Sequence, residues 1–212
     1  MADEHVISRR EFIKVTSIIG SGFAIGFNSL VGSKHQASNF SPDTFVNVLS
    51  DDTIILSVSK AEMGQGVWTS LPMLIAEEME ASWDKVKVNQ TSKDSFMGTG
   101  GSMAIKDYGW KKMRKSGAIA KYMLIEAAAL KWKVSPLECD AKNSVVVHRK
   151  SGKKSSYGSL VEEASKIKIP KKVKLKHNSN FTLLGKDMLR TDSKIKVDGS
   201  APFAMDINLE GM

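Results

Sequence analysis

Cysteine is nearly absent from this chain, which has one thiol, Cys139, among its 212 residues. A single thiol excludes an internal disulfide. It also excludes an iron–sulfur cluster or a four-cysteine zinc site built from this chain alone, because each needs several thiolates. The four histidines lack the spacing typical of metal ligands, so we interpret none as a ligand: they are His5, His35, His148 and His177. Redox chemistry would therefore depend on a bound cofactor or on a partner.

Nucleotide-binding signatures are absent as well. No lysine follows the glycine-rich segments in the pattern of a P-loop, and no strand–GxGxxG–helix unit is present, which argues against ATP and NAD sites. Long apolar runs are also lacking. The most apolar stretch, residues 15–31, is short for a membrane span and is diluted by glycine and serine.

Charge is distributed unevenly, with a net −4 over residues 1–100 and a net +12 over residues 101–212. The densest basic run, residues 166–177, alternates lysine with apolar residues. This pattern is compatible with an anionic or nucleic-acid surface, and also with a solvated linker or edge strand. No aromatic residue or arginine lies within the run, so base stacking and bidentate base recognition are unsupported. We favour the linker or strand and expect no nucleic-acid partner.

The N-terminus carries a motif typical of export by the twin-arginine route. Its matching residues are Ser8, Arg9, Arg10, Phe12, Ile13 and Lys14. The weakly apolar run that follows suits this route better than general secretion. We therefore predict a leader over residues 1–39, a periplasmic location and recognition by the twin-arginine translocase. Cleavage near Ala37 or retention as a membrane tether are both open.

Hydrophobic periodicity after residue 40 predicts an α+β fold, with a mixed, largely antiparallel sheet and helices packed on one side. Alternating apolar residues predict strands at 44–50, 53–59, 85–91, 137–141 and 145–149. Helical periodicity predicts helices at 71–81, 108–132 and 157–166, followed by short strands and turns. In the longest helix an apolar stripe that includes Tyr122, Met123 and Leu130 should be buried with Leu124, and Gly117 should permit close packing.

Two glycine-rich segments precede predicted helices and are candidate ligand sites. In the first, Gly64 and Gly66 flank Gln65; the second spans residues 98–102. Free amides at a helix N-terminus bind anions such as phosphate, and glycine lets a ligand approach the backbone. The side-chain amide of Gln65 can donate and accept, which suits a pterin or nucleotide edge. A tight turn without any ligand would produce the same pattern, so both interpretations are open here.

These segments belong to a wider pattern that resembles the molybdopterin-binding large subunits of the xanthine dehydrogenase family, closest to the isoquinoline 1-oxidoreductase beta subunits. The matching segments are 62–79 (EMGQGVWTSLPMLIAEEM), Trp83, 99–102 (TGGS), 117–129, 156–160 (SYGSL), 181–186 (FTLLGK), 190–192 (RTD), 196–201 (KVDGSA) and 203–206 (FAMD). The twin-arginine motif also fits that branch. The resemblance covers nearly all of the chain after the leader.

The resemblance implies a periplasmic oxidoreductase subunit that oxidises aldehydes or N-heteroaromatic compounds and passes electrons to a separate 2Fe-2S subunit. It implies part of a site for molybdopterin cytosine dinucleotide, formed by Gly64, Gln65, Gly66, Thr69, Gly100, Gly101 and Ser102. It places a partial molybdopterin-binding domain at residues 40–190 and the start of the next domain at residues 191–212.

Subunits of that family are far longer than this chain, which lacks their later glycine-rich loop and the glutamate that serves as catalytic base. We therefore name no catalytic or metal-ligating residue. We expect an N-terminal portion, inactive alone, that needs a C-terminal portion, encoded separately or cut off by a truncation. The alternative is an exported binding or assembly module that keeps the fold without catalysis.

Overall fold

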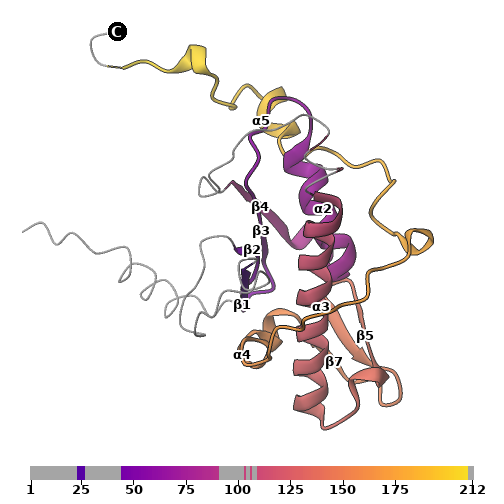
Figure 1. The fold of residues 1–212 in the computed structure, drawn as a ribbon. Helices are drawn as coiled ribbons and strands as arrows, with labels where there is room; N and C mark the ends of the chain where they lie inside the picture. The colour runs from indigo at the N-terminus through magenta and orange to yellow at the C-terminus, as the bar shows by residue number, and fades with distance from the viewer. Residues whose placement is uncertain (1–22, 27–43, 91–102, 104–105, 107–108, 210–212) are drawn as a thin grey trace, which may run out of the picture.

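The computed structural model describes residues 23–26, 44–90, 103, 106 and 109–209, and it confirms the predicted α+β class (Figure 1). Four strands form one sheet in sequence order: β1 (Phe23–Gly26), β2 (Thr44–Val48), β3 (Ile54–Val58) and β4 (Val86–Gln90). The pairs β1–β2 and β2–β3 are antiparallel, whereas β3 and β4 are parallel. A parallel pair needs a crossover connection, and helix α2 (Val67–Met79) supplies it.

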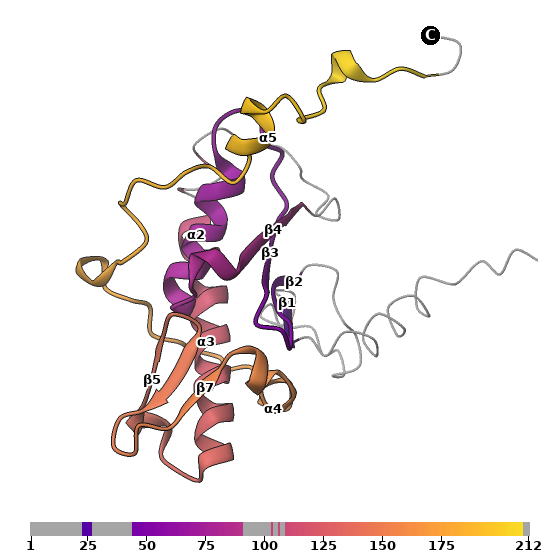
Figure 2. The same cartoon turned by 180° about the vertical axis from the view of Figure 1, so that it is seen from behind.

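A second, separate sheet follows α3 (Trp110–Trp132), where we expected one continuous sheet. Its antiparallel strands are β5 (Cys139–Lys142), β6 (Val145–His148) and β7 (Lys154–Ser156). The 23 residues of α3 span about 35 Å at 1.5 Å each. The helix therefore carries the chain past the first sheet, and the new strands lie beside the lower part of α3 (Figure 2).

The remaining helices are short. They are α4 (Val161–Ser165), α5 (Ser193–Val197) and the 3₁₀ turns Trp83–Lys85, Pro136–Glu138, Gly158–Leu160, Asn178–Asn180 and Ala204–Asp206. Within the ranges that the structure covers, no helix has both the length and the apolarity needed to cross a bilayer.

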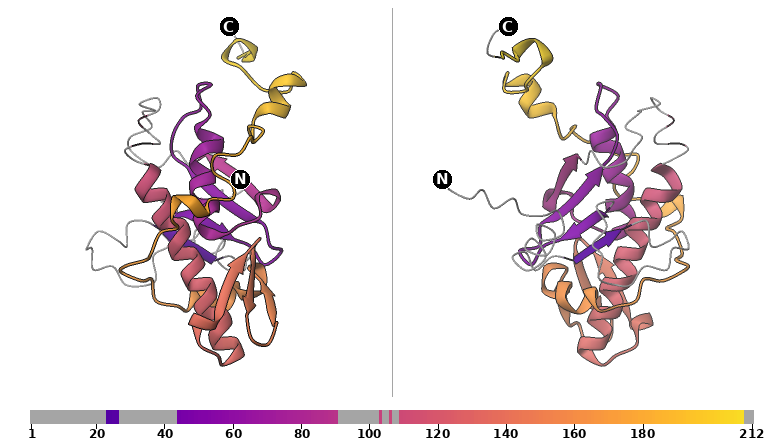
Figure 3. Two further views of the ribbon diagram at one scale, coloured as in Figure 1. Left: turned by 90° about the vertical axis from the view of Figure 1, so that its right-hand side faces the viewer. Right: turned by 60° about the vertical axis from the view of Figure 1, so that its left-hand side comes forward.

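The main core lies between the first sheet and the helices α2 and α3, which pack side by side on it (Figure 3). Met123 and Leu124 are 3% and 0% exposed, as predicted. Tyr122 and Leu130 are 41% and 66% exposed, so the predicted stripe was too wide. The cause is that neighbouring elements cover only part of the circumference of α3, and these two side chains remain on its solvent side.

Gly117 lies where α3 crosses α2. A Cβ at this position would come within 2.2 Å of the carbonyl oxygen of Ile75 in α2. The predicted close packing at this glycine is therefore confirmed. The preceding residue, Ser116, is fully buried, and its hydroxyl has no hydrogen-bond partner among the described residues.

Residues 166–192 form an extended segment, called the strap below, in place of the short strands that we expected. Ile167, Ile169 and Val173 pack against the core, while the lysines between them are exposed. Most of the alternating basic run is thus a solvated linker, the interpretation that the sequence favoured, whereas Lys176 near its end is largely buried. Several strap amides bond to buried carboxylates of α2, so a neighbouring strand is not their partner.

Two consecutive glutamates of α2 hold the strap. Glu77 accepts hydrogen bonds from the amides of Thr182, Leu183 and Leu184 at 3.0, 2.7 and 2.9 Å, and it pairs with the ammonium group of Lys176. Both carboxylates are fully buried. Burial alone would raise the pKa of Glu77, but the bonds from Lys176 and these amides outweigh it and lower the pKa below its ordinary value of 4.5.

Glu78 makes the second anchor. Its carboxylate accepts from the amide of Lys176 at 2.9 Å and from Nε of Arg114 at 2.7 Å. The guanidinium of Arg114 in turn lies over the rings of Trp110 and Phe181, at 4.8 and 5.1 Å from their centroids. Because buried charges are tolerated only when they are paired, this network links α2, α3 and the strap into one unit.

The contact at Gly117 gives a stability prediction. Gly117→Ala adds a methyl group against the backbone of α2, so the helices must move apart. We expect the free energy of unfolding to fall by about 1–3 kcal/mol. Ser116→Ala is the matched control. It removes a buried hydroxyl without a partner and should leave stability unchanged or slightly higher. Urea unfolding followed by circular dichroism measures both. Equal midpoints for Gly117→Ala and wild type would contradict the close contact.

The lowered pKa of Glu77 predicts that the protein loses stability in acid. Because its folded pKa is lowered, its contribution is complete above about pH 4.5 and is lost as the pH falls through the folded pKa. Glu77→Gln places an amide nitrogen against N–H donors and should lower the unfolding free energy at pH 7 by about 3–5 kcal/mol. The variant should also show a shallower loss between pH 5 and pH 3, measured by urea titration.

Glu162→Gln serves as the control for that titration, because Glu162 is an exposed carboxylate of α4 that pairs with the exposed Lys166. Its stability curve should follow the wild-type curve. If Glu77→Gln matches wild type at both pH values, the strap is not held by this carboxylate.

Candidate functional site

The first glycine-rich segment, residues 62–66, links the end of β3 to α2 and is called the glycine loop below. Gly64 and Gly66 have φ angles of +101° and +84°, a backbone conformation that residues with a side chain rarely adopt. Among the described residues, no atom lies within 4 Å of a Cβ built at either position. The backbone at both glycines therefore faces open space, and a ligand could approach it closely.

The amides at the start of α2 are already bonded to an internal carboxylate. Glu62 accepts from the amides of Gly64, Gly66 and Trp68 at 2.8, 2.9 and 3.1 Å. Burial would raise the pKa of Glu62, but these three amides and a nearby arginine outweigh it and lower the pKa. We expected free amides for a phosphate. An anion could use these three only by displacing Glu62.

Gln65 and Thr69 also make internal bonds. The side-chain oxygen of Gln65 accepts from the amide of Met63 at 2.6 Å, and its nitrogen donates to the carbonyl of Ala61 at 2.9 Å. The buried hydroxyl of Thr69 accepts from the amide of Thr191 at 3.0 Å. Both side chains thus form hydrogen bonds within the protein, and their contact with a cofactor stays a prediction.

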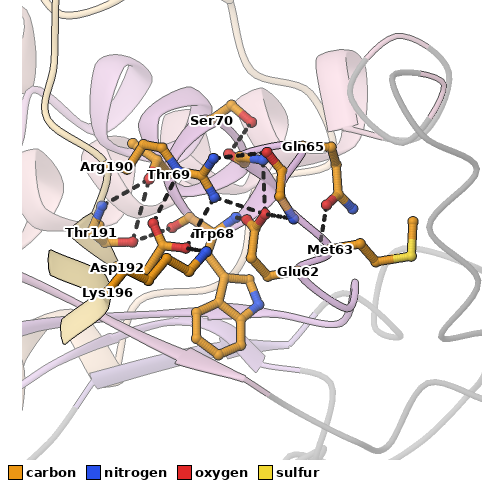
Figure 4. Close-up of polar contacts among 12 residues, drawn as sticks. Glu62, Met63, Gln65, Trp68, Thr69, Ser70, Arg190, Thr191, Asp192 and Lys196 are labelled. Carbon is orange, nitrogen blue, oxygen red and sulfur yellow. Dashed lines mark hydrogen bonds and ion pairs between the residues drawn. The ribbon is translucent and has the colours of Figure 1, made fainter. Parts of the chain in front are cut away.

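Sequence reasoning missed the functional neighbours of the loop, residues 190–192 (Figure 4). Arg190 donates from Nη1 to the carbonyl of Gly64 at 2.7 Å and from Nη2 to Glu62 at 3.0 Å. The same guanidinium donates to both carboxylate oxygens of Asp192 at 3.0 Å. These bonds lower the pKa of Asp192 to about 2, so both partners are charged at neutral pH.

A proline gave one signal in the sequence for this contact. Pro72 lies inside α2 and has no amide hydrogen, so the carbonyl of Trp68 loses its helical donor. The hydroxyl of Thr191 donates to this Trp68 carbonyl instead, at 3.3 Å. A proline within a buried helix thus marked a position where another segment had to supply a hydrogen bond.

Several predicted residues lie outside the described residues. They are Gly100, Gly101 and Ser102 of the second glycine segment, and Ser8, Arg9, Arg10, Phe12, Ile13 and Lys14 of the export motif. Residues 23–26, which fall inside the predicted leader, pair with β2 as strand β1. Across the part of the chain that can be described, no group of three or more His, Cys, Asp or Glu residues is placed to hold a metal ion.

Comparison with known proteins identifies the relatives of the chain. The family described as molybdopterin cofactor-binding domain matches residues 4–206. The chain is 28% identical to the isoquinoline 1-oxidoreductase subunit beta of Brevundimonas diminuta over 97% of its own length and 32% of the relative. It is 32% identical to the membrane-bound aldehyde dehydrogenase [pyrroloquinoline-quinone] of Gluconacetobacter polyoxogenes, over 97% of the chain and 28% of the relative.

Among solved structures, quinoline 2-oxidoreductase from Pseudomonas putida 86 is similar to this chain at 16% identity, with a TM-score of 0.47. The match covers 55% of this chain and 15% of that chain. The chain thus spans about a third of the length of the curated relatives it matches.

Proposed function

Because this chain belongs to the molybdopterin cofactor-binding domain family, we propose that it forms the N-terminal part of a molybdenum hydroxylase subunit that oxidises aldehydes or N-heteroaromatic compounds. The names of its relatives support this proposal, since they include an isoquinoline oxidoreductase subunit and an aldehyde dehydrogenase. The bound cofactor supplies the redox chemistry, while the protein holds and orients it. We propose the cytosine dinucleotide form of molybdopterin.

The observation that carries the proposal is the open backbone at Gly64 and Gly66, at the start of α2. Nothing protrudes from these two residues, so a bulky ligand can lie directly on the loop. Glu62 and Gln65 bond the loop backbone from within. This arrangement suits contact with a large planar group through backbone and carbonyl atoms. It suits capture of a phosphate by free amides less well.

The proposal assigns no catalytic residue to this chain. The described residues form part of a cofactor cradle, and we place the second glycine segment, which contains Gly100, Gly101 and Ser102, beside the same ligand. Turnover is expected only when a C-terminal portion and a 2Fe-2S subunit are present. The single cysteine of the chain agrees with clusters that are held by a partner.

A C-terminal portion would find an apolar surface on residues 197–209. This tail extends away from the body (Figure 1), and its large apolar side chains are 56–96% exposed: Val197, Phe203, Met205, Ile207 and Leu209. Apolar side chains gathered on an exposed segment are typical of a surface that another polypeptide segment covers. We propose that the C-terminal portion packs here, whether it belongs to the same polypeptide or to a second one.

The cofactor proposal predicts the effect of adding bulk to the open loop. Asparagine tolerates positive φ, so Gly66→Asn should preserve the fold while its side chain occupies the space of the ligand. Steric overlap of about 1–3 kcal/mol corresponds to cofactor retention lowered about ten- to a hundred-fold. The tagged chain is purified with its partners from its native host, and molybdenum and cytosine nucleotide are quantified.

Gly152→Asn is the matched control, because Gly152 also has a positive φ of 68° and open space, in the turn between β6 and β7. It should leave the cofactor content unchanged. A wild-type complex that contains no molybdenum would contradict the proposal and favour a non-catalytic binding or assembly module. If the purified complex contains pyrroloquinoline quinone and no molybdenum, its cofactor is the one in the name of the aldehyde dehydrogenase relative. Equal molybdenum in Gly66→Asn and wild type would remove the loop from the site.

We also propose export to the periplasm by the twin-arginine route. Arg9→Lys together with Arg10→Lys should keep the chain in the cytoplasm, because the translocase recognises the arginine pair as an address. Cell fractionation and immunoblotting measure the distribution. Equal export of the double variant would contradict the proposal. Cleavage near Ala37 would remove strand β1 from the first sheet.

A further inference from the structure

Residues 190–192 bond to the glycine loop and to the first turn of α2 across 122 to 128 residues of sequence. Two of these bonds come from Arg190, to Gly64 and Glu62, and two come from Thr191, to Thr69 and Trp68. Figure 4 shows that these groups converge on one side of the loop, while the Met63 side chain points away from them. The C-terminal part of the chain thus forms one wall of the candidate site.

Charges alternate through this cluster. Lys196 pairs with Asp192, Asp192 with Arg190, and Arg190 with Glu62, whose carboxylate then accepts the loop amides. Asp192 and the Glu62 side chain are 4% and 7% exposed, so each needs a partner to remain ionised. Arg190 is the common partner of the two carboxylates. Without it, the two carboxylates would lose the ion-pair partner that they share.

The geometry requires a guanidinium group. Arg190 reaches the Gly64 carbonyl, one oxygen of Glu62 and both oxygens of Asp192 at 2.7–3.0 Å. The planar fork of arginine offers five donors in fixed directions, whereas lysine has one compact ammonium group. The loop contains two glycines in a backbone conformation that other residues rarely adopt, so contacts from outside help to select that conformation.

We infer that Arg190 is a positioning residue for the cofactor: it fixes the glycine loop in the conformation in which Gly64 and Gly66 face the ligand. The identity of the ligand rests on the proposed function above. The conformation of the loop can be measured without any ligand, which allows the two ideas to fail separately.

Hydrogen exchange on the full chain provides the first test. In Arg190→Gln, the amides of Gly64, Gly66 and Trp68 should exchange about ten- to a hundred-fold faster, as expected for the loss of a charge-assisted hydrogen bond. The amides of Ile119 and Leu124 in α3 report global unfolding and should keep their wild-type rates. The matched control is Arg149→Gln, because Arg149 also bonds one carboxylate, of Asp140 in β5, and one backbone carbonyl, of Leu137 in the preceding 3₁₀ turn.

The pH profile separates positioning from a general loss of stability. Protection of the loop is present above the folded pKa of Glu62 and is lost as the pH falls through it, because the carboxylate then stops accepting. Glu62 pairs with Arg190, which also pairs with Asp192, and Asp192 pairs with Lys196. Removing the positive charge of Arg190 should move the midpoint of this loss to higher pH. Arg190→Lys keeps the charge, so its midpoint should stay near wild type while exchange at Gly64 still rises.

The outcomes are distinct. Wild-type exchange rates and an unchanged midpoint in Arg190→Gln would overturn the inference. Uniformly faster exchange, with the α3 amides included, would also overturn it, since the arginine would then only stabilise the fold. The third measurement is the molybdenum content of purified complexes, where Arg190→Gln should retain about tenfold less molybdenum than wild type. Equal molybdenum in the two would overturn the positioning role, whereas its absence from wild type would overturn the proposed function alone.

Discussion

The buried carboxylate of Glu77 is the contact on which the C-terminal half of the structure depends. It accepts the amides of Thr182, Leu183 and Leu184, and with Glu78 it fixes the strap against α2. A strap that is not paired in a sheet has few other partners for its amides, and a buried carboxylate without donors would be strongly destabilising. Each side therefore needs the other. Because the strap is fixed at this point, its end reaches the glycine loop, and residues 190–192 can bond to it.

The candidate site is accordingly an assembly of two distant parts of the chain. The loop contributes an open backbone at Gly64 and Gly66, and the far end of the strap contributes Arg190 and its carboxylate partner. An internal anion, Glu62, caps the helix, so the loop is held from within and leaves its outer face to a ligand. Such a surface is compatible with the molybdopterin cofactor that the family binds.

Local rules of sequence are broken where these parts meet. Pro72 lies in the interior of α2, and two adjacent glutamates lie on a helix that is buried on nearly all sides. Each irregularity is compensated by distant segments: the Thr191 hydroxyl donates to the carbonyl that lacks a helical donor, the strap amides donate to both carboxylates, and Lys176 and Arg114 balance their charges. Departures of this kind are expected near functional sites, where geometry matters more than local preference.

The sequence by itself determined the fold class, most strands, the buried face of α3 at Met123 and Leu124, and the close approach at Gly117, because these follow from apolar periodicity and from the absence of a side chain. It also located the glycine loop before α2. Only the tertiary structure decided that the helix amides belong to Glu62, that Gln65 and Thr69 bond inside the protein, and that Arg190 completes the wall. Periodicity reports the neighbours of a residue along one element. The partners of these polar groups lie up to 128 residues away, where the packing of the strap sets the distances.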